Sequence, residues 1–118
     1  MVSASVGPGL WYVKVPGQPT LIVNEFRALA SRRVEDVHWL LEMSRGVCDD
    51  ADFPLDPPLD ESHVLPIHKF ELNGIGLYFA IRATGPRQVF LLGLFDYATI
   101  DSNAALTNAI LRLQFVPI

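Results

Sequence analysis

A chain of 118 residues, 50% of them hydrophobic and 19% charged, has the size of a single domain with a substantial core. Its net charge of −4 argues against a main role in binding nucleic acid or an anionic membrane, because proteins with those roles carry basic surfaces. The single cysteine excludes an internal disulfide. No apolar run approaches the roughly 20 residues that span a bilayer, and no signal-peptide pattern is present. We therefore expect a cytoplasmic protein.

The N-terminal part of the chain predicts one or two short strands. Residues 10–15 are mostly β-branched or aromatic, which is typical of a strand. Residues 16–19 (Pro-Gly-Gln-Pro) predict a turn, and residues 20–23 predict a short return strand. These residues also fit a single strand with an irregular approach to a helix, so both a strand and a hairpin are open.

A long amphipathic helix is predicted next. Asn24 is a suitable N-cap, and Glu25 after it suits the positive end of the helix dipole. Apolar residues then recur at steps of three and four, with an end near Gly46, which predicts about six helical turns. Ser31 would serve as a second N-cap, so one long helix or a tight pair both fit. The apolar stripe comprises Phe26, Leu29, Ala30, Val34, Val37, Leu40 and Leu41.

An acidic, proline-rich loop is predicted over residues 47–63. Its six acidic residues and three prolines disfavour both a helix and a central strand. A loop of this length inside a compact domain is uncommon and often functional. Its apolar side chains Phe53, Leu55 and Leu59 either dock on a partner or fix the loop to its own domain, and the second outcome is the more usual.

The second half of the chain predicts a three-stranded antiparallel meander over residues 65–72, 75–83 and 88–98. Asn73-Gly74 is the strongest short hairpin signal, because a type I′ turn needs positive φ at both central positions. Thr84-Gly85-Pro86-Arg87 predicts the second turn. The second and third strands are apolar on both faces, so we expect the sheet to be covered on both.

The C-terminal part predicts a short helix over residues 103–113. Asp101 and Ser102 offer N-cap oxygens, and Arg112 is the one charged residue of the helix. A helix that is apolar nearly all round is either sandwiched or lies at a subunit contact, so a homo-oligomer through this helix is one expectation. The chain, residues 1–118, is thus predicted to be a single α+β domain, with a mainly antiparallel sheet packed against a long N-terminal helix and a short C-terminal helix.

No motif for a bound cofactor or metal is present. The chain lacks a phosphate-binding glycine loop, paired cysteines, a His-Glu-x-x-His motif and a Gly-x-Ser-x-Gly elbow, so no cofactor is expected. His38, His63 and His68 have no spacing that completes a metal-ligand set. A small enzyme that uses His68, Asp96 and Tyr97 is an alternative without a motif behind it.

The order of predicted elements over residues 10–113 resembles the RelE/ParE/HigB superfamily of toxins from bacterial toxin–antitoxin pairs. Those domains have a strand, a helical hairpin or long helix, a three-stranded antiparallel meander and often a short C-terminal helix. Residues 76–82 (Gly-Leu-Tyr-Phe-Ala-Ile-Arg) are similar to the family's glycine–aromatic–arginine strand. Residues 88–95 are similar to its closing apolar strand that ends in a Phe. The following Thr99 and the helix that carries Ala109 and Arg112 resemble the phage-derived HigB-like branch.

The resemblance implies a ribosome-dependent mRNA endoribonuclease that a small antitoxin neutralises. Family members activate the 2′-OH of RNA and stabilise the charged phosphorane with Arg and Lys, because the transition state carries additional negative charge. By position, Arg82 and Arg87 would face the phosphate. Tyr97 would occupy a position where the family commonly has a basic or aromatic residue.

The chain departs from the family after the closing Phe. The HigB-like branch usually has two lysines there, whereas this chain has Asp96-Tyr97-Ala98, and a net charge of −4 is unusual for a protein that docks on ribosomal RNA. The alternative is a non-enzymatic acidic binding protein, such as an immunity protein, a phage-encoded inhibitor or an accessory subunit. Its candidate partner-binding residues are Phe53, Leu55, Leu59 and Asp96. A protein partner is expected in either case, and nucleic acid is expected only for the toxin.

Overall fold

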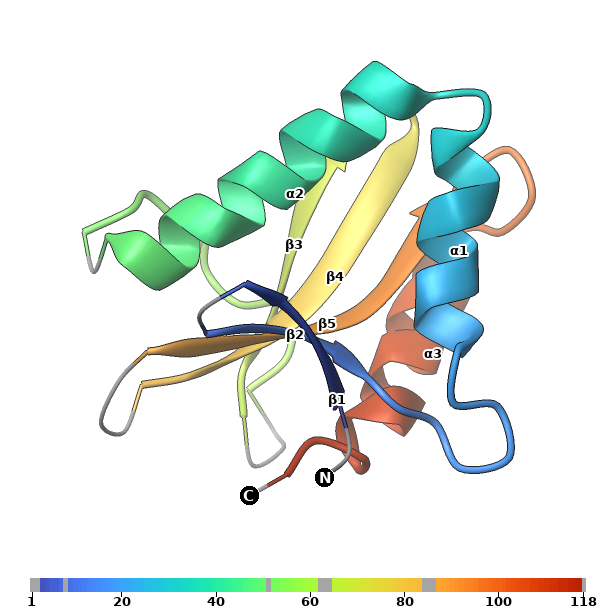
Figure 1. Ribbon diagram of the computed structural model, residues 1–118. Helices are drawn as coiled ribbons and strands as arrows, with labels where there is room; N and C mark the ends of the chain where they lie inside the picture. The colour runs from blue at the N-terminus through green and yellow to red at the C-terminus, as the bar shows by residue number, and fades with distance from the viewer. Residues whose placement is uncertain (1–2, 8, 51, 62–64, 84–86, 118) are drawn as a thin grey trace.

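The computed structural model describes residues 3–7, 9–50, 52–61, 65–83 and 87–117. These residues form five strands and three helices, and the predicted α+β class is confirmed (Figure 1). The elements are β1 (Ser3–Gly7), β2 (Leu10–Val13), α1 (Leu21–Ala30), α2 (Val34–Asp49), β3 (Ile67–Leu72), β4 (Ile75–Arg82), β5 (Gln88–Asp96) and α3 (Ser102–Leu113).

The strands form one sheet in the order β1-β2-β5-β4-β3. The sequence predicts a mainly antiparallel sheet, and the structure corrects this to a mixed one, because β2 is parallel to β5. The other three pairings are antiparallel. The cause is the path from β2 to β3: α1 and α2 carry the chain back across the sheet, so β3 starts in the same direction as β2. After two antiparallel steps, β5 runs in that direction too.

The N-terminal hairpin is formed by β1 and β2, and the predicted return strand over residues 20–23 is wrong. Thr20 is instead the N-cap residue of α1. Asn24, the predicted N-cap, lies inside the helix and donates a hydrogen bond from Nδ2 to Thr20 Oγ1 at 3.1 Å. Burial of one helical stripe therefore outweighs the β-propensity of the Leu-Ile-Val run that opens the helix. The buried residues of α1 are Ile22, Phe26 and Leu29.

Of the two alternatives for the N-terminal helical region, the single long helix is wrong and the pair is confirmed, because the chain forms α1 and α2 with a break at residues 31–33. Ser31 does not cap α2: its hydroxyl donates to the carbonyl of Ala28 at 2.7 Å, at the end of α1. Arg33 is the N-cap residue of α2, and its guanidinium donates to Asp36 and to the carbonyl of Asn73 in the β3–β4 turn. The start of the second helix thus coincides with a contact to a distant turn.

The antiparallel meander of β3, β4 and β5 is confirmed. Asn73 and Gly74 have φ values of 52° and 81°, as the predicted tight turn requires. Every residue from Ile75 to Ile81 is buried, so the middle strand is shielded on both faces as expected. Of the second predicted turn, residues 84–86 lie outside the described part of the chain.

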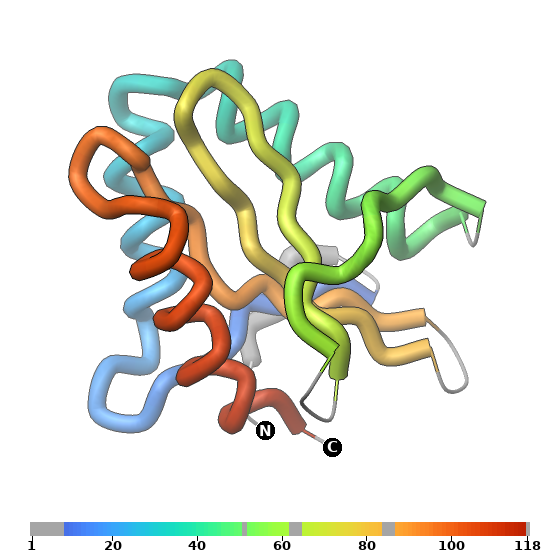
Figure 2. The backbone as a smooth tube through the Cα atoms, turned by 180° about the vertical axis from the view of Figure 1, so that it is seen from behind, coloured from blue at the N-terminus to red at the C-terminus, as the bar shows by residue number. Residues whose placement is uncertain are grey.

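Helices cover both faces of the sheet. Figure 1 shows α2 lying across one face, and Figure 2, seen from behind, shows α3 in front of the other. On the α2 side, the rings of Phe70 and Phe79 pack with their centroids 4.9 Å apart. On the α3 side, Tyr78 and Phe95 make an edge contact at 5.5 Å. The two aromatic layers explain why both central strands are apolar throughout.

The C-terminal helix α3 begins at the predicted cap. Asp101 Oδ1 accepts a hydrogen bond from the backbone N–H of Ala104 at 2.8 Å. One face of α3 packs against β4 and β5, while Leu111 on another face is 56% exposed. The buried residues of α3 are Ala105, Ala109 and Leu113.

Candidate functional site

Arg82, a predicted phosphate-binding residue, ends β4 and holds the C-terminal segment. Its Nη1 donates to the carbonyl of Pro117, and its Nη2 donates to Gln88 Oε1. The guanidinium also lies 5.1 Å from the centroid of the Phe90 ring. Both Nη atoms therefore bind acceptors of the same chain, and a phosphate would have to displace one of these acceptors.

Arg87, the second predicted phosphate-binding residue, lies just before β5 and contacts the end of α2. Its Nη1 donates to the carbonyl of Asp50 at 2.9 Å. Close by, Cys48 Sγ donates to the carbonyl of Gly9 at 3.3 Å. Burial raises the pKa of the Cys48 thiol, so at neutral pH it is protonated and a poor nucleophile. These contacts join α2 to the start of the β2–β5 pairing.

Tyr97, the third predicted catalytic residue, follows β5 and lies in a cluster with Lys69, Glu71 and Tyr78. Its hydroxyl oxygen is 2.8 Å from that of Tyr78, and Lys69 Nζ donates to Glu71 Oε1 at 2.5 Å. Burial raises the pKa of the Tyr97 phenol, and the hydrogen bond with Tyr78 raises it further. The phenol therefore stays protonated at neutral pH, where it can donate a hydrogen bond but cannot act as a general base.

The structure does not bring the three predicted catalytic residues together. A Cβ on Gly76 would collide with the Tyr97 hydroxyl, so Tyr97 lies beside the start of β4. Arg82 is the last residue of the same strand, about 20 Å away at roughly 3.3 Å per residue. Arg87 binds the end of α2 instead. Arg82 and Arg87 thus flank the same end of the β4–β5 pair but bind different segments, and Tyr97 lies at the other end.

The acidic loop begins later than predicted, because α2 continues to Asp49. Residues 51 and 62–63 of the predicted loop lie outside the described part of the chain. The described part pairs with the edge of β3: the N–H of Leu59 donates to the carbonyl of Ile67 at 2.8 Å, and the N–H of Ile67 donates to the carbonyl of Asp60 at 3.0 Å. The backbone of the loop is therefore fixed to the sheet.

The three apolar side chains of the loop, predicted as partner-binding residues, have different surroundings. Phe53 is half-buried, with its ring 6.0 Å from that of Phe70, and Leu55 is half-buried against the core. A Cβ on Gly46 would lie 2.5 Å from the Phe53 ring, so α2 leaves room for it. Leu59 is exposed. Two of the three side chains thus attach the loop to its own domain.

Asp96, also a predicted partner-binding residue, ends β5 and holds the turn before α3. Its Oδ1 accepts from the N–H of Ala98 at 2.9 Å, and its Oδ2 accepts from Arg32 Nη2 at 3.1 Å. The Ala98 N–H holds the pKa of Asp96 below its usual value, and Arg32 lowers it further. Both carboxylate oxygens therefore already have partners in the chain.

A cleft of ≈350 Å³ lies between α1, α3 and the end of β5. Along it, Arg112 Nη1 and Nη2 each donate to the Glu25 carboxylate at 2.8 Å. The pairing of β2 with β5 reaches only to Leu91, and beyond it the N–H of Leu94 donates to Glu25 Oε1 at 3.3 Å. The carbonyl of Leu92 accepts from Arg112 at 2.9 Å. The ion pair thus supplies hydrogen-bond partners for the backbone groups of β5 that β2 does not reach, which is a structural role.

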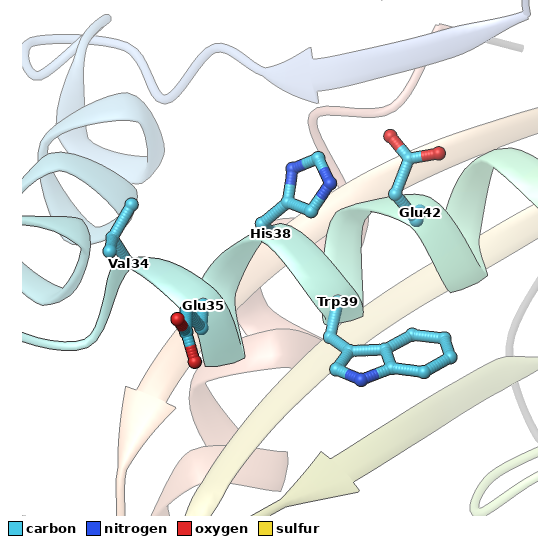
Figure 3. A pocket seen from close by; sticks show the side chains of 5 residues that line it. All are labelled: Val34, Glu35, His38, Trp39 and Glu42. Atoms are coloured by element: carbon cyan, nitrogen blue, oxygen red, sulfur yellow. The ribbon is translucent and has the colours of Figure 1, made fainter.

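The outer face of α2 exposes two large apolar side chains. Val34 is 64% and Trp39 is 61% exposed. Together with Glu35, His38 and Glu42, they line an open surface hollow of ≈580 Å³ (Figure 3). We call these five residues the α2 patch. In this patch the polar and charged side chains lie between the two apolar ones, and a large apolar group such as Trp39 in water beside them is typical of an interaction surface.

The sequence interpretation missed the α2 patch. It placed Val34 in the buried stripe, which is wrong, because the break before α2 makes Val34 the first residue of a new helix. The buried stripe of α2 instead includes Val37 and Leu40. At 100° per residue, Trp39 lies about 200° from Val37, on the polar side of the helix. A Trp among charged residues on the polar side of a predicted helix was the sequence signal that could have indicated this surface.

His38 and His68, the histidines in the described part of the chain, have different surroundings. Among the described residues, no group of three or more His, Cys, Asp or Glu side chains is arranged to hold a metal ion. His63 lies outside those residues, and His38 belongs to the α2 patch. His68 is buried and stacks on Phe79 at 5.7 Å. Burial lowers the pKa of His68, so the imidazole is neutral at pH 7.

Comparison of the chain with protein-family models, with curated proteins and with solved structures gave no match. None of the helices in the described part of the chain has both the length and the apolar character needed to cross a bilayer. Function must therefore be inferred from the arrangement of side chains.

Proposed function

We propose that the protein is a non-enzymatic binding protein that acts by protein–protein contact through the α2 patch. The observation that carries this proposal is the exposure of Trp39 on a helix face whose neighbours are mostly polar or charged. Trp is enriched among the few residues that dominate the free energy of protein–protein binding. Val34 is the second exposed apolar side chain of the patch, about 140° around the helix from Trp39 at 100° per residue.

The other apolar side chains of the surface support α2 rather than the acidic loop as the contact site. Phe53 and Leu55 already pack against the core. Leu59 and Leu111 are exposed on different elements, and singly exposed leucines are ordinary in soluble proteins. Val34 and Trp39, by contrast, share one hollow on one helix.

The proposal is tested by photo-crosslinking in the native cells. An aromatic crosslinking amino acid, which keeps a large apolar ring at the site, is placed at position 39, and at position 111 as the matched control, since both side chains are exposed. We expect position 39 to give a defined adduct that position 111 does not give. The purified partner should then lose at least about tenfold in affinity for Trp39→Ala and less than about twofold for Leu111→Ala.

The opposite pattern would refute the proposal. If position 39 gives no adduct beyond that of position 111, or if Trp39→Ala binds the purified partner as tightly as the parent protein, the α2 patch is not the contact site. Circular dichroism of both alanine variants checks that the fold is intact, which we expect because neither side chain is buried.

A second candidate is the RelE/ParE/HigB-like toxin that the sequence resembles, a ribosome-dependent mRNA endoribonuclease with an antitoxin partner. The observation that favours it is the layout, in which a strand is followed by two helices, a meander and a last helix. Its predicted catalytic residues Arg82, Arg87 and Tyr97 are dispersed and engaged in the chain, and the net charge is −4. The toxin is therefore the weaker proposal.

Expression in growing bacteria tests the toxin directly. A toxin arrests growth, and Arg82→Ala or Arg87→Ala should each relieve the arrest. The relief counts only if the variants melt within a few degrees of the parent protein, because both arginines also hold structural contacts. Normal growth with folded, soluble protein would rule out an active toxin.

A further inference from the structure

We propose that the partner segment bound by the α2 patch is a basic amphipathic helix. This inference rests on the proposed function and names the chemistry of its partner. The α2 patch consists of two rows of side chains at four-residue spacing, Val34–His38–Glu42 and Glu35–Trp39. In Figure 3, His38 and Glu42 point to one side of the helix and Trp39 points to the other.

The shape of the hollow fits a helix. Side chains four residues apart form ridges along a helix, and the groove between two such ridges accepts a ridge of another helix. The patch spans residues 34–42, which is about 12 Å at 1.5 Å per residue and slightly more than two turns. A partner helix of three or four turns would cover it completely. An apolar row in its contact face would meet Trp39.

The charge of α2 specifies a basic partner. The helix carries four acidic residues and one basic residue, Arg45, and of the acidic residues Asp36 is already paired with Arg33. Arg45 pairs with Glu42, but the pair is exposed and therefore weak. Glu35 lies in the patch beside Trp39, and the whole chain has a net charge of −4. Lys or Arg beside the apolar row of the partner would meet these carboxylates, whereas a second copy of this chain would bring like charges together.

The test is a selection from a display library of helical peptides with randomised surface positions on one rigid scaffold. The purified protein is the target, and Trp39→Ala is the counter-target. We expect the recovered peptides to carry Lys or Arg beside an apolar row and a positive net charge. Their affinity should fall at least about tenfold on Trp39→Ala.

A matched pair of charge reversals separates local from overall electrostatics. Glu35→Lys with Glu42→Lys, and Asp52→Lys with Glu61→Lys in the acidic loop, each change the net charge from −4 to 0. All four side chains are exposed. We expect the pair in the α2 patch to weaken the selected peptides at least about tenfold and the loop pair to weaken them less than about threefold, because screening limits distant charges.

Three results would overturn the inference: recovery of neutral or acidic peptides, equal effects of the two charge-reversal pairs, or a selection that yields no peptide dependent on Trp39. The proposed function fails separately. If position 39 crosslinks a natural partner through an acidic or non-helical segment, the α2 patch is still the contact site and only the basic helix is wrong. If position 39 gives no adduct beyond that of position 111, both fail.

Discussion

The ion pair between Glu25 and Arg112 joins three elements, and its loss should have a large effect on stability. Arg112 binds the Glu25 carboxylate with two hydrogen bonds and the carbonyl of Leu92 with a third. Glu25 also accepts the N–H of Leu94. Arg112→Met keeps an apolar stem near the Phe95 ring but leaves the carboxylate with no cation. The perturbation therefore isolates the charge and its hydrogen bonds.

The magnitude follows from burial. The side chains of Arg112 and Glu25 are 11% and 19% exposed. Removing one partner of a buried ion pair costs about 3–5 kcal/mol, and partial access of water to Glu25 lowers this to about 2–4 kcal/mol. That is a large share of the roughly 5–15 kcal/mol that stabilises an ordinary domain. The matched control is Arg32→Met, which breaks a pair whose arginine is 60% exposed and should cost less than about 1 kcal/mol.

The assay is urea unfolding followed by tryptophan fluorescence, with hydrogen exchange at the Leu94 amide as a local probe. We expect Arg112→Met to lower the free energy of unfolding well beyond Arg32→Met and to speed exchange at Leu94. Adding Glu25→Gln to Arg112→Met should recover stability, because it removes the unpaired carboxylate charge. The reasoning is refuted if the two methionine variants are equally stable, or if Glu25→Gln destabilises Arg112→Met further.

Three further predictions concern the tyrosine pair, a buried histidine and the acidic loop. Tyr97→Phe removes the hydroxyl that forms a hydrogen bond with the buried Tyr78, and it should lower the free energy of unfolding in urea by about 1–3 kcal/mol. Adding Tyr78→Phe to this variant should cost little more, because the hydrogen bond is already lost. If the losses of the two variants add, they do not share a hydrogen bond. Burial lowers the folded-state pKa of His68 below 6.5, so as the pH falls the unfolded chain binds a proton before the folded one, and the free energy of unfolding should fall below pH 6.5. His68→Gln should flatten the dependence of the unfolding free energy on pH between about pH 6.5 and 5, and an unchanged dependence would count against this prediction. Gly46→Ala places a Cβ 2.5 Å from the Phe53 ring, so the ring has to move and the loop is held less firmly. Limited proteolysis should therefore cut residues 52–61 faster than in the parent protein, both in this variant and in Phe53→Ala. Slower cutting than in the parent protein would contradict the prediction.

The meander was predictable because its signals are local. Asn73-Gly74 supplies two residues that tolerate positive φ, and the structure has both there. The apolar runs on either side of this turn predict, by themselves, strands that are covered on both faces. In the structure, residues 75–81 are buried throughout. The cap of α3 is equally local, since Asp101 binds an N–H only three residues ahead.

The N-terminal half was harder to predict because distant contacts decide it. The run at residues 21–23 has the composition of a strand, yet it is helical because it opens a buried helical stripe. The division of α1 from α2 coincides with a contact between Arg33 and Asn73, 40 residues apart. The predicted catalytic residues were chosen from a resemblance of layout, although the predicted meander itself separates Arg82, beside the second turn, from Tyr97, at the far end of the next strand.

The sequence by itself determined the α+β class, the meander with its tight turn, and the cap of α3, because these depend on residues only a few positions apart. The tertiary structure alone decided that β2 joins β5 in parallel, that Glu25 and Arg112 meet at an open strand edge, and that Trp39 faces water. Each of these depends on which surfaces remain free after the long-range packing is complete. Periodicity shows that a helix has an apolar stripe, but it cannot show which of its other side chains are left uncovered.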